Sequence, residues 1–140
     1  MIIVTGTPGV GKTTFAKALA EKEGRSYVCL TALCDEYGLL SEWDEKRQCF
    51  VVDSVSLVDI VLKYADEDAV VDGHLSHELP SSVVSACYVV KCPLDLLKKR
   101  LEVRGYSPEK IRENLDCEIF DVCYCEALEN GHSPIVVSSQ

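Results

Sequence analysis

The chain has 140 residues, of which 47% are hydrophobic and 26% are charged, and its formal net charge is −9. This length is typical of one domain, and the composition is that of a soluble globular protein. The negative charge argues against a protein that binds nucleic acid through its phosphates, because such contacts require a surplus of Lys and Arg. It favours small anions held at a local site, or a basic protein partner.

Eight cysteines are present, yet no two form a C-x-x-C pair and no histidine lies at zinc-finger spacing. Their spacing therefore predicts no zinc site. Cys87 falls in an apolar run and Cys117, Cys123 and Cys125 fall in a helical pattern, which indicates free thiols in a reducing cytoplasm. The apolar start 1–4 lacks a basic leader and is too short to cross a bilayer, so we expect no membrane association.

Strand and helix patterns alternate along the chain. Strands are predicted at 2–5, 27–30, 69–72, 86–91 and 135–137, with a further extended segment at 49–53. Helices are predicted at 13–23, 31–38, 54–64, 93–105 and 108–129, with Thr31, Ser54 and Ser107 as caps and an irregular polar stretch at 39–48. This alternation predicts a single α/β domain over 1–140, with a parallel sheet covered on both faces.

A glycine-rich loop follows the first predicted strand. Gly6, Gly11, Lys12 and Thr13 satisfy the pattern G-x-x-x-x-G-K-[ST]. Glycines allow backbone N–H groups to curl around a phosphate, and the helix that follows offers its positive end to an anion. The lysine of such a loop reaches the β- and γ-phosphates, and its Thr hydroxyl ligates Mg²⁺. We therefore predict a P-loop that binds ATP and Mg²⁺; a merely structural glycine turn is the less favoured interpretation.

An acidic residue ends the strand predicted at 69–72. P-loop enzymes need a second carboxylate near the magnesium, and Asp72 fits that role. His74 lies two residues further on, on the same side of an extended segment, where it could position a water molecule or orient Asp72. The alternatives are a cap or turn residue for Asp72 and a loop hydrogen bond for His74. His77 is assigned a structural role.

On these residues, the sequence resembles the adenylate kinase isoenzyme 6 family, including its archaeal members. The resemblance covers nearly the whole chain. It is carried by the loop Gly6–Thr13 with Thr14, by Asp72-x-His74, and by Arg104-Gly105-Tyr106 leading into Lys110, Asn114 and Cys117–Phe120. It implies a nucleoside monophosphate kinase-like three-layer fold with a five-stranded parallel sheet and a short lid.

The resemblance also implies a reaction and its site residues. The reaction is ATP plus AMP to two ADP, accompanied by ATP hydrolysis. The region at about 29–52 is expected to bind the monophosphate, and the lid over ATP is expected at about 103–113. By position, the ATP contacts are expected from Gly9, Gly11, Lys12, Thr13, Thr14 and Arg104. Arg100 lies four residues before Arg104 on the same helix face, so both could clamp the transferred phosphoryl group.

The monophosphate side departs from the usual pattern of nucleotide kinases. Between 31 and 52 the only basic residues are Lys46 and Arg47, so AMP binding would depend on one of them. The resemblance implies that family members continue beyond the last strand with a helix, a segment that often helps to hold the adenine. Two other functions stay open. The first is an ATP-hydrolysing assembly switch that acts on a basic ribosomal protein of the small-subunit platform, with Glu42, Asp44 and Glu45 as a candidate contact. The second is a kinase of another small metabolite.

Overall fold

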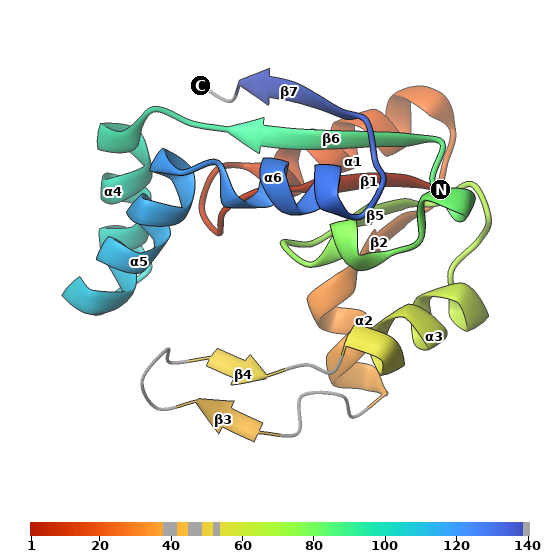
Figure 1. Cartoon of the computed structure of the whole chain (residues 1–140), viewed down its shortest axis with the longest axis horizontal. Helices are drawn as coiled ribbons and strands as arrows, with labels where there is room; N and C mark the ends of the chain where they lie inside the picture. The colour runs from red at the N-terminus through yellow and green to blue at the C-terminus, as the bar shows by residue number, and fades with distance from the viewer. Residues whose placement is uncertain (38–41, 45–48, 52–53, 139–140) are drawn as a thin grey trace.

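The computed structural model describes residues 1–37, 42–44, 49–51 and 54–138. Its main sheet has five parallel strands in the order β2-β5-β1-β6-β7. The strands are β1 (Ile2–Thr5), β2 (Tyr27–Cys29), β5 (Val70–Asp72), β6 (Ala86–Lys91) and β7 (Pro134–Ser138). The prediction of an α/β fold with a five-stranded parallel sheet is therefore confirmed. In Figure 1 this sheet crosses the molecule and helices lie on both of its faces.

Two hydrophobic clusters hold the helices on the sheet. One cluster joins residues of the strands to α1 (Lys12–Glu23), α4 (Leu94–Val103) and α5 (Pro108–Ile119). The other joins them to α2 (Leu30–Glu36), α3 (Ser54–Tyr64) and α6 (Val122–Glu129). Along β1, Ile3 belongs to the second cluster while Ile2 and Val4 belong to the first, because successive side chains of a strand point to opposite faces. The strand is apolar throughout because both of its faces are covered.

Two short 3-10 helices follow β5, and a separate hairpin precedes α3. The 3-10 helices are η1 (Ser76–Glu78) and η2 (Ser81–Val83). The hairpin pairs β3 (Glu42–Asp44) with β4 (Cys49–Val51) in antiparallel register, and Figure 1 shows it beyond α2 and α3, away from the main sheet. The extended segment predicted at 49–53 is thus β4 in part. The prediction of an irregular stretch at 39–48 is wrong at 42–44, because β3 forms by pairing with β4 rather than through a local sequence signal.

The sequence also misplaced two helix boundaries. The single helix predicted over 108–129 is two helices, because Asp121 adopts a left-handed conformation (φ 52°) that ends α5 and starts α6 in a new direction. Helix α2 begins at Leu30 rather than after a Thr31 cap, and its N-cap residue is Cys29. Ser107 caps α5 as predicted, since its hydroxyl accepts from the Lys110 N–H. In the part of the chain that the structure describes, no helix has the length and apolar character that a membrane crossing requires.

Candidate functional site

The glycine-rich loop connects β1 to α1 at the carboxyl end of the sheet. Gly6, Gly9 and Gly11 all have positive φ, and Gly11 is the N-cap residue of α1. A Cβ at Gly6 would lie 2.7 Å from the Val90 carbonyl oxygen, so a side chain there would displace the loop. Within the described residues no side chain caps α1. The first N–H groups of this helix therefore face the loop and can bind an anion.

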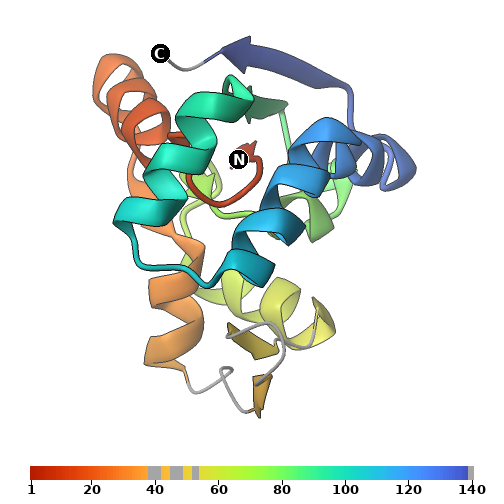
Figure 2. The same ribbon diagram turned by 90° about the vertical axis from the view of Figure 1, so that its left-hand side faces the viewer.

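Helices α4 and α5 flank this loop, which Figure 2 shows in red between them. On the α4 side, Leu97 packs under Gly9, and Arg100 Nη1 donates to the Gly9 carbonyl at 3.2 Å. On the α5 side, the Thr7 hydroxyl donates to Glu118 Oε1 at 3.4 Å. The loop is thus fixed from both sides by contacts with residues far away in the sequence.

Lys12 folds back over the loop, and its Nζ donates to the Thr7 carbonyl at 3.2 Å. Burial lowers the pKa of Lys12, while the nearby Asp72 carboxylate opposes this shift and Arg104 adds to it. Arg104 stands at the C-terminus of α4 and is exposed. The structure therefore brings Lys12, Asp72 and Arg104 within electrostatic range of one another. Arg100, in contrast, is engaged with the loop backbone.

Asp72 ends β5 next to the loop. Its Oδ2 accepts a hydrogen bond from the Thr13 hydroxyl at 2.8 Å and another from the Tyr27 hydroxyl at 2.7 Å. Its Oδ1 is buried and has no hydrogen-bond partner among the described residues. A buried carboxylate oxygen without a partner is costly, and beside a Thr hydroxyl it forms an oxygen-rich pair suited to a hard cation such as Mg²⁺. The residues present thus fit the metal that such a loop implies.

Tyr27 is a site residue that sequence reasoning missed. Its hydroxyl reaches Asp72 because β2 lies next to β5, with Tyr27 paired to Val70. Burial raises the pKa of Tyr27, and its hydrogen bond to Asp72 raises it further, so the phenol remains a donor at physiological pH. A lone tyrosine in a short apolar run gives no local signal of this contact. Only the strand order brings it to the site.

His74 lies two residues after Asp72 and within electrostatic range of Lys12. Desolvation by the surrounding protein lowers the pKa of His74 to about 4, and the Lys12 ammonium is the next cause, although the residue as a whole is exposed. Lys110 of α5 contributes in the same direction. The imidazole is therefore neutral at physiological pH, and it can orient a water molecule without adding charge.

The remaining predicted residues lie outside the phosphate site or outside the described part of the chain, or are exposed on α1. Thr14 is exposed on the first turn of α1. Lys46, Arg47 and Glu45 lie outside the described residues, as do the side chains of Glu42 and Asp44. The rest of the region expected to bind the monophosphate is described except at 38–41, 48 and 52. His77, assigned only a structural role, is 1% exposed and hydrogen-bonds with Thr5 and Glu126.

Solved structures similar to this chain have the same fold. A shikimate kinase from Acinetobacter baumannii in complex with shikimate matches with a TM-score of 0.67 and 15% identity, over 99% of this chain and 83% of that one. A shikimate kinase from Bacteroides thetaiotaomicron matches with a TM-score of 0.64 and 18% identity, over 98% and 84% of the two chains. At these identities the likeness concerns the fold alone.

Sequence comparison gives the family. A family model described as "AAA domain" matches residues 2–121. An "Adenylate kinase isoenzyme 6 homolog" from Caenorhabditis elegans is 38% identical over 96% of this chain and 76% of its own length. A "Putative adenylate kinase" from Pyrococcus abyssi is 40% identical over 99% of this chain and 74% of its own length. The glycine-rich loop, the acid at the end of β5 and these relatives together place the chain in the adenylate kinase isoenzyme 6 family.

Proposed function

We propose that the chain is a nucleoside monophosphate kinase that transfers the γ-phosphoryl group of ATP to AMP, and to water when AMP is absent. The observation that carries this proposal is the buried, unpartnered Oδ1 of Asp72 beside the Thr13 hydroxyl, at the start of a helix that follows a P-loop. The names of the relatives support AMP as the acceptor. Phosphoryl transfer needs mainly positioning and charge neutralisation, which this arrangement can supply.

Thr13 and Asp72 are the residues that would hold Mg²⁺. When bound, the ion would supply positive charge that offsets the negative charge developing on the transferred phosphoryl group. The protein contributes the orientation of the carboxylate, since the Tyr27 and Thr13 hydroxyls fix Oδ2 and leave Oδ1 available. Both donors are held by secondary structure, so the carboxylate is oriented before any ligand arrives.

Two cations of the chain act on the phosphates. Lys12 exchanges its hydrogen bond with the Thr7 carbonyl for one with the β- or γ-phosphate, and this anion also offsets the desolvation of its ammonium. Arg104 approaches from the lid, for which we propose residues 103–113. Arg100 holds the Gly9 carbonyl and so shapes the loop. His74, neutral at physiological pH, orients the attacking water in the absence of AMP.

The test is an ADP assay with MgATP, with and without AMP. We expect AMP to stimulate ADP formation, Lys12→Ala to abolish it, and Lys22→Ala, on the exposed last turn of the same helix, to leave it unchanged. A Lys12→Ala variant with full turnover means that the site is wrong. Hydrolysis that persists without stimulation by AMP favours the switch or a kinase of another metabolite over an adenylate kinase.

A link to small ribosomal subunit maturation rests on the net charge of −9, which suits a basic ribosomal protein as partner. In this version of the function the hydrolysis of ATP drives release of the partner. Co-purification with a small basic ribosomal protein that is lost when ATP is hydrolysed, and retained by Lys12→Ala, supports it. Equal retention by the unmodified chain and the variant contradicts it.

A further inference from the structure

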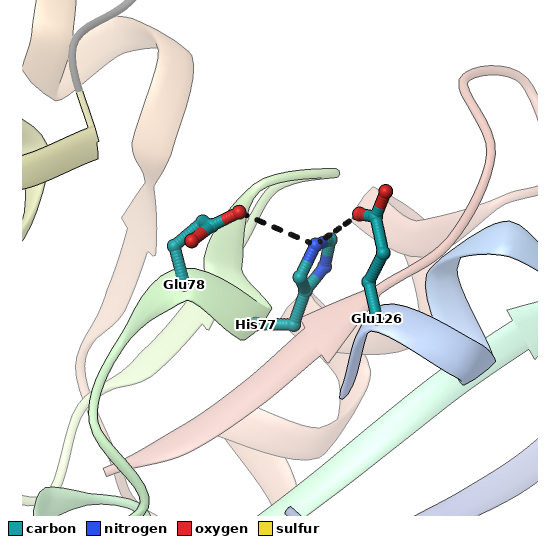
Figure 3. Close-up of side chains that lie close together, drawn as sticks. All are labelled: His77, Glu78 and Glu126. Atoms are coloured by element: carbon teal, nitrogen blue, oxygen red, sulfur yellow. Dashed lines mark hydrogen bonds and ion pairs between the residues drawn. The ribbon is translucent and has the colours of Figure 1, made fainter. Parts of the chain in front are cut away.

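Three side chains outside the phosphate site gather around one ring nitrogen. Figure 3 shows His77 and Glu78, from η1, facing Glu126 from α6. His77 Nε2 lies 2.7 Å from Glu126 Oε2 and 3.9 Å from Glu78 Oε1. One ligand atom from each residue lies within 4.8 Å of the other two. A buried imidazole nitrogen therefore faces two carboxylates that come from different elements.

The contact between His77 Nδ1 and the Thr5 hydroxyl indicates which ring nitrogen carries a hydrogen. The Thr5 hydroxyl has a single hydrogen, which it donates to the His74 carbonyl at 3.2 Å. At the 3.0 Å contact with His77 Nδ1, the hydroxyl must therefore accept, and Nδ1 carries a hydrogen. With Nδ1 as the donor, Nε2 faces the two carboxylates, and either a second proton or a bound cation on Nε2 offsets their negative charge.

The ring is rigidly placed while the acids remain reachable. The His77 carbonyl accepts from Asn130 Nδ2 at 2.9 Å and is 3.0 Å from His132 Nε2. The His77 side chain is 1% exposed, whereas Glu78 and Glu126 are 34% and 44% exposed. Metal-binding histidines in proteins are usually held by a hydrogen bond at the other ring nitrogen, as His77 is. The two carboxylates beside it are accessible to solvent. Solvent can supply the remaining ligand.

We propose that His77 Nε2, Glu78 and Glu126 bind a divalent transition-metal ion of the Zn²⁺ type. One nitrogen and two carboxylates suit Zn²⁺, whereas Mg²⁺ and Ca²⁺ prefer oxygen alone. Tetrahedral Zn²⁺ with ligand bonds near 2.1 Å sets its ligand atoms about 3.4 Å apart. The observed 2.7 and 3.9 Å bracket that value, so small rotations of two partly exposed glutamates complete the geometry. The ion would tie η1, which follows β5, to α6.

The experiment uses the reduced, nucleotide-free protein in excess Mg²⁺, titrated with Co²⁺ as a visible substitute for Zn²⁺ and then displaced by Zn²⁺. We expect one Co²⁺ per chain with tetrahedral visible absorption and no thiolate-to-cobalt charge-transfer band. Glu126→Gln and Glu78→Gln should each weaken binding at least tenfold. Glu129→Gln removes the same charge from an exposed position on α6 and should bind like the unmodified chain.

Each other outcome overturns the proposal. A thiolate charge-transfer band that persists in Glu126→Gln places the ion on cysteines. No tetrahedral absorption in the unmodified chain means that His77 and Glu126 form an ion pair only, with the ring protonated on both nitrogens. Circular dichroism of the variants checks folding, and Glu78→Gln, which leaves the 2.7 Å contact intact, serves if Glu126→Gln unfolds. Because no nucleotide is used, the outcome is independent of the kinase assay.

Discussion

The hydroxyl of Thr13 donates a 2.8 Å hydrogen bond to Oδ2 of Asp72, joining residues that stand 59 positions apart in the chain. The contact crosses from the first turn of α1 to the end of β5, and it exists because β5 lies beside β1 in the sheet. The same carboxylate keeps Oδ1 buried and unpartnered within the described structure. A site whose carboxylate is left unsatisfied sacrifices some stability for function.

The first prediction follows from that unsatisfied oxygen. Asp72→Asn should lower kcat/KM for ADP formation by roughly 10²–10⁴-fold, because a metal ligand worth several kcal/mol in the transition state is weakened. The free energy of unfolding of the nucleotide-free protein should change by no more than about 1 kcal/mol, since the amide oxygen can keep both hydroxyl donors. Urea denaturation and the ADP assay measure the two effects. Asp59→Asn, exposed on α3, is the matched control.

The second prediction concerns Tyr27. Tyr27→Phe removes a 2.7 Å hydrogen bond to a charged acceptor, which should destabilise the protein by about 1.5 kcal/mol. The carboxylate then loses one of its two orienting donors, so kcat should fall by about 10–100-fold, the usual effect of removing a partner that orients a metal ligand. Tyr88→Phe, at a ring that packs on Phe15, is the control. Unchanged kcat in Tyr27→Phe would show that Thr13 alone orients Asp72.

The third prediction concerns the buried acid of α5. Glu118 accepts from Lys91 Nζ at 2.7 Å and from the Cys92 N–H at 3.0 Å. Glu118→Ala should cost about 3–5 kcal/mol of unfolding free energy, because it leaves a partly buried ammonium and a buried N–H without this acceptor. Glu118→Gln should cost less, about 1–3 kcal/mol. Glu113→Ala, exposed on the same helix, should change stability by less than about 0.5 kcal/mol. A similar loss there would mean that the contacts of Glu118 are not the cause.

The fourth prediction concerns thiol reactivity. Burial raises the pKa of Cys87 and that of Cys123 to about 11, so at pH 8 only about one in a thousand of these thiols is ionised. Cys125 is exposed. Iodoacetamide should therefore label Cys125 before Cys87 and Cys123, as read by peptide mass spectrometry. First labelling at Cys87 would contradict its burial.

The same shifts set a pH dependence of stability. Between the ordinary thiol pKa of 9.0 and about 11, unfolded thiols lose their protons while folded Cys87 and Cys123 keep theirs. The folded state then binds more protons than the unfolded state, so the free energy of unfolding falls as pH rises through this window. Replacing Cys87 with Ser should make the fall shallower in urea denaturation at pH 9 to 11.

The sequence predicts the elements of the sheet well because their signals are local. Apolar runs mark the five strands, and Ser107 with Pro108 marks the start of α5. The signals that failed are those that depend on distant partners. β3 becomes a strand only by pairing with β4. The helix break at Asp121 requires a left-handed backbone conformation, and the sequence has no glycine there to indicate it.

The candidate site follows the same division. Lys12, Thr13 and Asp72 were predicted because each occupies a fixed place relative to its own strand or helix. Tyr27 was not, because its contact with Asp72 depends on strand order. Nor could the sequence link His77 to Glu126, which stands 49 residues away on another element. The spacing of cysteines, which predicts no zinc site, says nothing about a cluster of one histidine and two glutamates.

The turn at Asp121 has a mechanical consequence. Glu118, before it, fixes the glycine-rich loop, and Glu126, eight residues later, reaches His77. Had α5 continued straight, Glu126 would lie about 12 Å beyond Glu118 along the helix axis, at about 1.5 Å per residue. The φ and ψ angles of Asp121 therefore direct Glu118 and Glu126 to two different places. A residue that cannot adopt a left-handed conformation at position 121 would displace both carboxylates at once.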